Sequence, residues 1–191
     1  MKQDHLVQPI IVHTSAYRDE ARMISDAAVA SVLSLTGVMD EVQKEWFLTG
    51  QRKSARRVKK ERDLIDAQRD SIGVRVGSAV AGRVLTYRDF TPVLRRAQVS
   101  MWTEPEKSAP ADSPFGTVTF NEDVNLTIGK RIVSASHALV LHYLSSGVLP
   151  TAGDLLNIRY GSSPGDGAVT VTDNGVTEVS PGTVTCWFNK K

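Results

Sequence analysis

The sequence predicts an α/β fold in which a mixed β-sheet is layered with helices. Three observations support this prediction: short β-branched runs such as "PIIVHT" and "GTVTFN", apolar stripes of helical spacing that follow each run, and C-terminal segments in which apolar residues alternate with period two. Strands that alternate with helical segments are typical of layered α/β proteins.

In the first half, "PIIVHT" predicts a strand, and residues 19–35 predict a helix with an apolar stripe from Ala21 to Leu35. The charged segment at about 40–69 is predicted to form one or two helices, with Gly50 as a candidate break. After it, "IGVRVGSAVAG" predicts another strand, and "YRDFTPVLRRAQVSMW" combines a short helix or turn with an edge strand.

The second half repeats the opening order. "GTVTFN" predicts a strand, residues 127–144 predict a helix, and "GAVTVTDNG" and "GTVTCWF" predict two more strands. A shift of 110 residues aligns Ile24–Val38 with Ser134–Val148, two small-residue helical segments that both end in Gly-Val. The hypothesis is therefore a fold of two degenerate repeats.

A proline-rich stretch, "TEPEKSAPADSPFG", separates the two halves and is typical of an extended connector. It divides the chain into an N-terminal α/β half at residues 1–102, a linker at 103–115 and a C-terminal half at 116–191. Lys and Arg outnumber Asp and Glu by 17 to 12 in residues 1–102, against 5 to 6 in residues 115–191. This asymmetry suggests that the first half meets an anionic partner.

Composition narrows the class of protein. Hydrophobic residues make up 41% of the 191 residues and charged residues 23%, values close to those of globular proteins. No apolar run is long enough to cross a membrane, and the first residues lack the apolar core of a signal peptide. Cys186 is the only cysteine, which excludes an intrachain disulfide and a cysteine-rich zinc site. These features predict a cytoplasmic protein without a membrane partner.

The segment "RKSARRVKKER", Arg52–Arg62, holds seven basic residues in eleven. On the predicted helix, Ala55 and Val58 would face inward, and the cations would form an outer surface for the phosphates of a nucleic acid. Such contacts position RNA without reading its sequence. The alternative is a solvated face, partly neutralised by neighbouring carboxylates. The candidate RNA-binding residues are Arg52, Lys53, Arg56, Arg57, Lys59 and Lys60.

Three residues of the second half are candidates for chemistry. Lys130 lies in the first turn of the predicted helix, where free backbone N–H groups and the positive end of the helix dipole favour an anion. His137 follows two turns later. Asp173 ends a predicted strand and could pair with a lysine or orient a water molecule. Taken singly, each residue more often has a surface, packing or turn role.

Together these segments resemble the type II peptidyl-tRNA hydrolase family. That family has G-K-x-A-x-Q-x-x-H-A on a helix and D-A-G-x-T-E-V-x-P-G-T-x-T near the end of the chain. The helix motif is matched at Gly129, Lys130, His137 and Ala138. The terminal motif is matched at Asp173, Gly175, Thr177, Glu178, Val179, Pro181, Gly182, Thr183 and Thr185. The resemblance covers about residues 115–191.

The first half, with Trp46 before the basic segment, resembles the longer, two-part members of this family found in actinobacteria. The helix motif is degenerate, because Ser134 replaces the family glutamine and Asn125 stands where an earlier lysine is expected. Asn174 replaces the alanine that follows the aspartate.

The resemblance implies cleavage of the ester between a peptide and the 3′ end of tRNA. It assigns Lys130 to the stabilisation of negative charge, Asp173 to the orientation of Lys130 or a water molecule, Thr177 to a hydroxyl contact, and His137 to support of the site. No metal or organic cofactor is implied. The expected partner is tRNA, and a homodimer is left open.

Other functions stay open at this stage. The changes at Asn125 and Ser134 favour a catalytically inactive tRNA- or RNA-binding protein on the same fold. A structural or assembly protein with a charged helix would show no salt-sensitive affinity for RNA. A general DNA-binding function lacks support from a helix-turn-helix or zinc signature.

Overall fold

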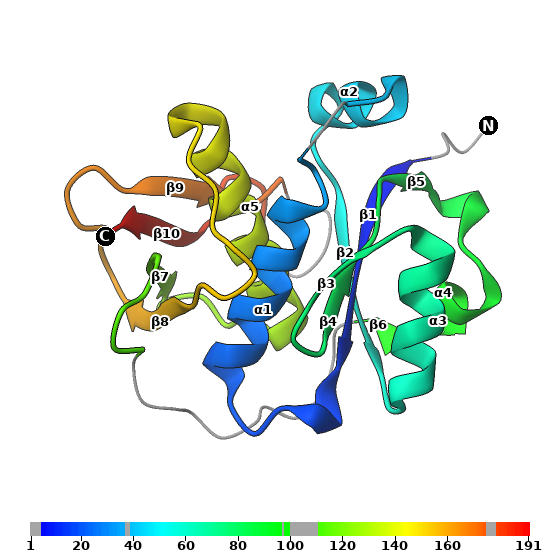
Figure 1. Ribbon diagram of the computed structural model, residues 1–191. Coiled ribbons are helices and arrows are strands. Elements are labelled where there is room, and N and C mark those ends of the chain that lie inside the picture. Colours follow the sequence, from blue (N-terminus) through cyan, green and yellow to red (C-terminus); the bar gives the residue numbers. More distant parts are fainter. Residues whose placement is uncertain (1–4, 37–38, 97, 100–110, 175–178) are drawn as a thin grey trace.

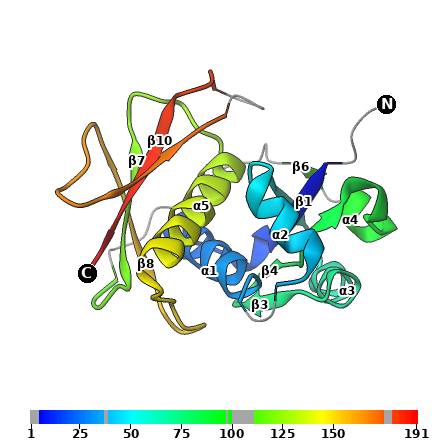
Figure 2. The same ribbon diagram turned by 90° about the horizontal axis from the view of Figure 1, so that it is seen from above.

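Two β-sheets enclose a pair of helices, α1 (Glu20–Leu33) and α5 (Ile128–Ser146) (Figure 1). The structure is a computed structural model and describes residues 5–36, 39–96, 98–99, 111–174 and 179–191. Seen from above, α1 and α5 lie between the two sheets, while two further helices cover the outer side of the first sheet (Figure 2). The predicted α/β fold with mixed sheets is therefore confirmed.

The first half of the chain builds a six-stranded sheet with the order β3-β4-β1-β2-β6, and β5 pairs separately with β1. Strand β1 is parallel to β2 and antiparallel to β4. Six of its eight residues are buried, as expected of a strand that is covered on both faces. Its strands are β1 (Leu6–His13), β2 (Lys53–Val58), β3 (Val74–Val76), β4 (Ala79–Ala81), β5 (Leu85–Thr86) and β6 (Gln98–Val99).

Short helices connect these strands. Helices α3 and α4 lie on the outer side of the sheet, and α2 lies above α1 at the top of the molecule (Figure 1). These elements are α2 (Glu41–Leu48), α3 (Glu61–Ser71), α4 (Pro92–Arg96) and the 3-10 turns η1 (Thr14–Ala16) and η2 (Tyr87–Asp89). The predicted short helix and edge strand near the end of this half are both present, as α4 and β6.

The second half builds a four-stranded sheet with the order β8-β7-β10-β9. Its elements are β7 (Gly116–Asn121), α5, β8 (Leu156–Gly161), β9 (Val169–Thr172) and β10 (Val184–Lys190). Three of these strands were predicted. Strand β8 was missed because it lies at the sheet edge, where only Leu156 of its six residues is buried.

The two sheets share one connectivity. In each half a strand leads through a helix to a parallel neighbour (β1–α1–β2 and β7–α5–β8), and a later antiparallel hairpin pairs with the first strand on its other side. Read from the hairpin, the orders are β3-β4-β1-β2 and β9-β10-β7-β8. This is the arrangement that an internal repeat produces.

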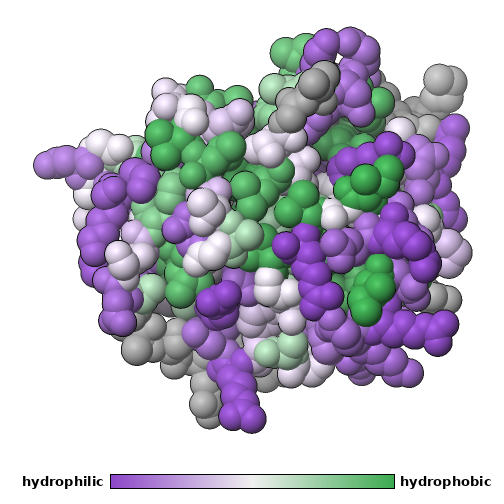
Figure 3. Space-filling view, in the orientation of Figure 1, coloured by the Kyte–Doolittle hydropathy of each residue, from purple (hydrophilic) through white to green (hydrophobic). Residues whose placement is uncertain are grey.

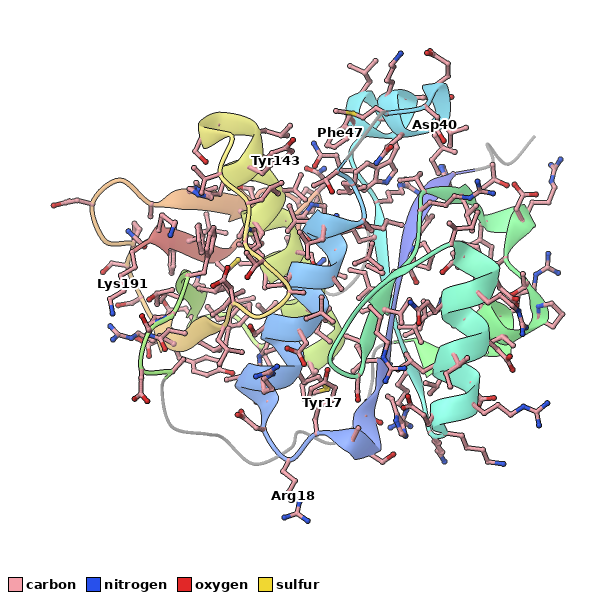
Figure 4. All side chains as sticks on the ribbon, viewed as in Figure 1. Tyr17, Arg18, Asp40, Phe47, Tyr143 and Lys191 are labelled. Atoms are coloured by element: carbon pink, nitrogen blue, oxygen red, sulfur yellow. The ribbon has the colours of Figure 1, made fainter. Side chains whose placement is uncertain are left out.

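The halves differ in the connection between the two strands of this hairpin, which are β3 and β4 in the first half and β9 and β10 in the second. In the first half, Gly77 and Ser78 form a tight turn, and Gly77 has a φ of +55°. A Cβ atom at Gly77 would overlap a carboxylate oxygen of Asp26, which accepts the hydroxyl of Tyr17 at 2.8 Å. Tyr17 lies at the foot of α1 while its neighbour Arg18 points away from the protein (Figure 4). In the second half, residues 173–183 separate the corresponding strands, β9 and β10.

Helix α1 begins where the sequence predicts, because Asp19 caps it by accepting the backbone N–H groups of Ala21 and Arg22. Its packing face consists of small residues, which lets two helix axes approach closely. Fully buried alanines line both central helices: Ala27, Ala28 and Ala30 on α1, and Ala135 and Ala138 on α5. One hydrophobic core contains residues from both halves, from Ile10 to Phe188.

The first sheet has a second core on its outer face. Ile10 and Val12 of β1 point into the shared core, whereas Val7 and Ile11 point outward. Leu64 of α3 is fully buried in this outer core. The period-two alternation of a strand therefore divides the first half between two cores.

The prediction of a basic helix at 52–62 is wrong. Residues 53–58 form strand β2, paired in parallel with β1 in the register Gln8↔Lys53 to His13↔Val58. Arg and Lys favour helices in isolation, but pairing with β1 and burial on both faces override that propensity. Because side chains alternate along a strand, the six cations do not form one surface. The helical segment predicted at about 40–69 is correct only toward its two ends, where α2 and α3 lie on either side of this strand.

The positions of polar and apolar residues on the surface correspond to the layers of the fold. On the face drawn in Figure 3, hydrophilic residues lie around the periphery, and hydrophobic residues gather where α1 and α5 meet the second sheet. Leu144 and Val148, near the C-terminal end of α5, are about half exposed. Within the part of the chain that the structure describes, no helix is long and apolar enough to cross a membrane.

A buried ionic contact joins the two halves. Glu20, at the start of α1, accepts from Arg131 of α5 at 2.9 Å and from the hydroxyl of Tyr160 on β8 at 2.5 Å. Only 2% of the Glu20 side chain and 13% of the Arg131 side chain are exposed. The second carboxylate oxygen of Glu20 is buried without a hydrogen-bond partner. Glu20 has therefore lost most of its hydration and depends on these two partners.

Replacing Glu20 with alanine is expected to lower the free energy of unfolding by about 3 kcal/mol, because it leaves the Arg131 charge buried without this carboxylate. Urea unfolding of Glu20→Ala and wild type measures the difference. Lys44→Ala, which removes an exposed ion pair with Glu41, is the control and should change stability by less than about 0.5 kcal/mol. Equal effects of the two substitutions would contradict a buried contact between the halves.

Candidate functional site

A pocket of about 450 Å³ lies between the two halves of the chain. The first half contributes the start of β2 and the residues before it, from Gly50 to Ala55. The second half contributes one face of α5, from Gly129 to Leu141, and the end of β9. Three of the four predicted catalytic residues, Lys130, His137 and Asp173, line this pocket. The fold therefore brings Asp173 to the same pocket as Lys130 and His137, which precede it by 43 and 36 positions in the sequence.

Lys130 and Asp173 form an ion pair in the pocket wall. Their side chains are only 9% and 11% exposed. Helix α5 begins after Thr127, whose hydroxyl accepts the backbone N–H of Lys130 at 3.3 Å. Lys130 thus lies in the first turn, where the helix dipole disfavours a cation. The Asp173 carboxylate offsets this cost and the loss of hydration.

Asp173 is held in place by the base of the loop that follows β9. Its backbone N–H donates to Thr183 O at 2.8 Å, and its own carbonyl accepts from Gly182 N at 2.8 Å. Gly182 has a φ of +86°, a conformation that glycine adopts without strain. The Pro181-Gly182 turn of the sequence motif therefore closes the loop and fixes the backbone of Asp173.

His137 lies on the pocket face of α5, two turns after Lys130. Burial holds its pKa well below the usual range, and the positive charges of Lys53 and Lys130 lower it further. Both lysines therefore act on the imidazole ring. A histidine in this environment is neutral near pH 7 and can accept a proton or a hydrogen bond.

Lys53 reaches the same pocket from β2 of the first half. Its ammonium donates to the side-chain oxygen of Gln8 at 2.6 Å and to the hydroxyl of Ser31 at 3.2 Å. It also lies 4.7 Å from the centre of the Trp46 ring. Burial lowers its pKa well below the usual range. Lys53 was predicted to bind RNA from a helix surface, but the strand directs it toward α1 and α5 instead.

The other five predicted RNA-binding residues lie in different environments. Arg52 lines the pocket beside Lys53. Arg56 is only 2% exposed in the outer layer, where it donates to Leu94 O at 3.0 Å and to the Tyr87 hydroxyl at 3.0 Å. Arg57 is partly buried, whereas Lys59 and Lys60 are exposed beyond the end of β2. The predicted continuous basic surface is therefore absent among these six residues.

Glu61, counted in the sequence as a neutralising carboxylate, has specific partners at the far end of β2. It accepts from Arg75 at 2.6 Å and binds the Nδ1 atom of His13 at 3.0 Å. The hydrogen bond from Arg75 is the main reason that its pKa is lowered. This cluster ties β1, β3 and α3 together and takes Glu61 away from Lys59 and Lys60.

The positions that depart from the family motifs have separate locations. Ser134 and Asn174 line the pocket, so two changed residues contact the site. Asn125 instead lines a second hollow of about 320 Å³, together with Arg131 and Tyr160. Thr177, a predicted catalytic residue, lies outside the described residues, as do Gly175 and Glu178.

Sequence reasoning missed several residues that complete the pocket. Val7 of β1 and Tyr87 of the η2 turn belong to segments that carry no motif. Their place depends on strand pairing, because β1 pairs with both β2 and β5. Apolar residues, including Val133, Leu141 and Val171, form the remaining wall. The pocket therefore combines an apolar surface with a few polar groups, as ligand sites commonly do.

Comparison with known proteins leaves the family undefined, since no protein-family model, curated protein or solved structure matches this chain. Among the residues that the structure describes, no three His, Cys, Asp or Glu side chains are grouped so that they could hold a metal ion. The chemistry must therefore be argued from the side chains of the pocket.

The titration of His137 tests this geometry. We expect its ring to remain neutral through the range in which an ordinary histidine gains a proton, because burial and two cations oppose protonation. The Lys53→Met substitution should raise the pKa of His137 only in part, because burial, the larger cause, remains. NMR signals of the histidine rings, assigned with His137→Gln, measure both shifts.

Lys59→Met is the matched control for this titration. It removes the same charge from an exposed position outside the pocket lining and should leave the pKa of His137 unchanged. An ordinary pKa for His137 in the wild-type protein would show that Lys53 and Lys130 do not both face it.

Proposed function

We propose that this protein is a peptidyl-tRNA hydrolase-like esterase that cleaves the ester between a peptide and the 3′ end of tRNA. One observation carries the proposal: the ion pair of Lys130 and Asp173 lies with His137 in the wall of one pocket. These are the positions that the resemblance to type II peptidyl-tRNA hydrolases identifies in the sequence. Their convergence supports a common chemical role, because Asp173 enters from a different strand than the helix that carries Lys130 and His137.

The proposed reaction is acyl transfer to water. A water oxygen attacks the ester carbonyl, and negative charge develops on the carbonyl oxygen. The Lys130 ammonium stabilises this charge, and Asp173 holds the ammonium in position. Neutral His137 accepts a hydrogen bond from the attacking water and orients it, and the proton of this water passes to the ribose oxygen as the ester bond breaks. The bond between the carbonyl carbon and the ribose oxygen then breaks, and that oxygen takes up a proton as the 3′ hydroxyl is released.

The pocket walls fit the two parts of such a substrate. Arg52 and Lys53 place positive charge on the side contributed by the first half, which suits the phosphates near the 3′ end of tRNA. The apolar wall suits the aminoacyl side chain or a nucleobase. A volume of about 450 Å³ accommodates a terminal nucleotide or an amino acid rather than a whole tRNA end, so most of the tRNA would lie outside the pocket.

A catalytically inactive tRNA-binding protein is the second candidate. Ser134 favours it, because this side chain lines the pocket at the position of the family glutamine and is too short to reach as far. In this alternative the Lys130–Asp173 pair has a structural role, and the pocket binds the tRNA end without turnover.

Hydrolysis of N-acetyl-aminoacyl-tRNA labelled at its 3′ end tests the first candidate. We expect Lys130→Met and Asp173→Asn each to reduce kcat at least about 100-fold, since each removes a charge that acts in the transition state. Lys59→Met, a charge loss at an exposed position, should retain wild-type turnover. Thermal unfolding confirms that each variant is folded. Full activity in the Asp173→Asn variant would exclude the proposed site.

Binding of deacylated tRNA separates the second candidate from an unrelated function. If the protein binds tRNA, affinity should fall steeply between 50 and 200 mM salt, because phosphate contacts release counterions. Filter binding at both salt concentrations measures this change. Salt-sensitive binding without turnover supports the inactive tRNA-binding protein, whereas the absence of binding and turnover excludes both candidates.

A further inference from the structure

We propose that Lys53 is the anion-recognising residue of the pocket and that it binds an oxyanion of the ligand, a phosphate in the proposed substrate. Through Lys53 and its neighbour Arg52 the first half of the chain contributes directly to a site whose Lys130–Asp173 ion pair lies on the second half. The inference deepens the proposed function and rests on it for the identity of the ligand. The binding of an oxyanion at Lys53 can be tested without any turnover.

The first argument is the set of contacts around the Lys53 ammonium. Its partners are an amide oxygen of Gln8, a hydroxyl of Ser31 and the face of the Trp46 ring. None of them carries a negative charge, and among the described residues no carboxylate lies within ion-pair distance of Lys53. A charged amine in such a setting loses hydration without a counter-ion in return. An anionic ligand would supply that counter-ion.

The second argument is the charge of the pocket. Among the residues that the structure describes, Arg52, Lys53 and Lys130 line it together with one carboxylate, Asp173, which is paired with Lys130. The Asp173 carboxylate is therefore not available to Lys53. The excess positive charge lies on the side of the first half, and an oxyanion placed there would face Arg52 and Lys53 at once.

The third argument is the support behind Lys53. Trp46 is fully buried, and its indole N–H donates to Arg52 O at 2.8 Å, the same oxygen that accepts from Gln8 N at 3.0 Å. The Gln8 side chain is itself fixed, since it donates to Ser31 O at 3.0 Å and to the Ser34 hydroxyl at 2.6 Å. Lys53 is thus held by a network of buried groups rather than placed freely on the surface.

The fourth argument is the backbone that precedes Lys53 at the pocket. Gln51 has a φ of 52° and Gly50 a φ of 97°, so two consecutive residues adopt left-handed or extended positive-φ conformations. For Gln51 this conformation is unfavourable. Both residues line the pocket, and the strained turn directs the chain from α2 into β2. Because this conformation is unfavourable for Gln51, we infer that the turn before β2 does more than connect two elements: it also places residues at the pocket.

Oxyanion binding at Lys53 should be coupled to protonation. Among the described residues, the charged or titratable groups that line the pocket with Lys53 are Arg52, Tyr87, Lys130, His137 and Asp173, while the groups that Lys53 contacts on α1 and α2 are the uncharged Ser31 and Trp46. Burial lowers the pKa of Lys53, and an anion at its ammonium would raise it again. Binding should therefore take up a proton and weaken as the pH rises.

The test measures binding by isothermal titration calorimetry with two probes, inorganic phosphate and the trinucleotide CCA. Wild type, Lys53→Met and Lys53→Arg are compared, with Lys44→Met as the control for loss of one exposed charge outside the pocket lining. We expect Lys53→Met to weaken binding at least tenfold, Lys53→Arg to retain most of it, and Lys44→Met to stay within twofold of wild type. Titrations in two buffers of different ionisation enthalpy should show net proton uptake for the wild type and none for Lys53→Met.

The outcomes separate this inference from the proposed function. Equal binding by Lys53→Met and wild type overturns the role of Lys53, whatever the enzyme activity. Binding of phosphate but not of CCA, with the expected loss in Lys53→Met, supports the oxyanion site and assigns it to a small phosphorylated ligand. If turnover of N-acetyl-aminoacyl-tRNA is present, Lys53→Met should raise KM with little change in kcat, whereas Lys130→Met should lower kcat. Thermal unfolding of each variant shows whether it is folded.

Discussion

The packing of α1 against α5 is the constraint on which the rest of the structure depends. Small residues on both helices allow the two halves to share one hydrophobic core, and the contact between Glu20 and Arg131 fixes their relative position. Because of this packing, β2 of the first sheet lies beside the face of α5 that carries Lys130 and His137. The pocket exists only because the halves meet in this way.

Comparison of the two halves, which share one connectivity, gives a physical reason why the candidate catalytic residues lie on the second half. Both halves contain the same βαβ unit and the same antiparallel hairpin. In the first half a tight turn at Gly77 packs on Asp26 and Tyr17, which fills the space beside α1. In the second half a longer loop holds Asp173 beside α5 and leaves a pocket. The candidate catalytic residues Lys130, His137 and Asp173 therefore lie on the second half, while the first half contributes Arg52 and Lys53 to the pocket.

The role of each basic residue in the segment at 52–62 depends on where its side chain is buried or exposed, and not on how many basic residues lie together in the sequence. The basic segment at 52–62 looked like one surface, but its members lie in the pocket, in the outer core and in solvent. Arg56 is satisfied by carbonyl and hydroxyl groups, while Lys53 faces the pocket. Each of these basic residues therefore has a different electrostatic role, and the number of basic residues in the segment does not reveal it.

The sequence by itself determined most of the elements and part of the site. Apolar spacing predicted α1 and α5, a β-branched run predicted β7, alternation predicted β9 and β10, and motif residues identified Lys130, His137 and Asp173 as candidates. Each of these patterns depends on residues that are close in the sequence, so it can be recognised without knowledge of the fold. Tertiary structure alone decided that 53–58 is a strand, that Lys53 enters the pocket and that Val7 and Tyr87 line it. Those outcomes depend on pairing with β1 and on helix packing between distant segments, and the free energy of such long-range contacts overrides local propensity.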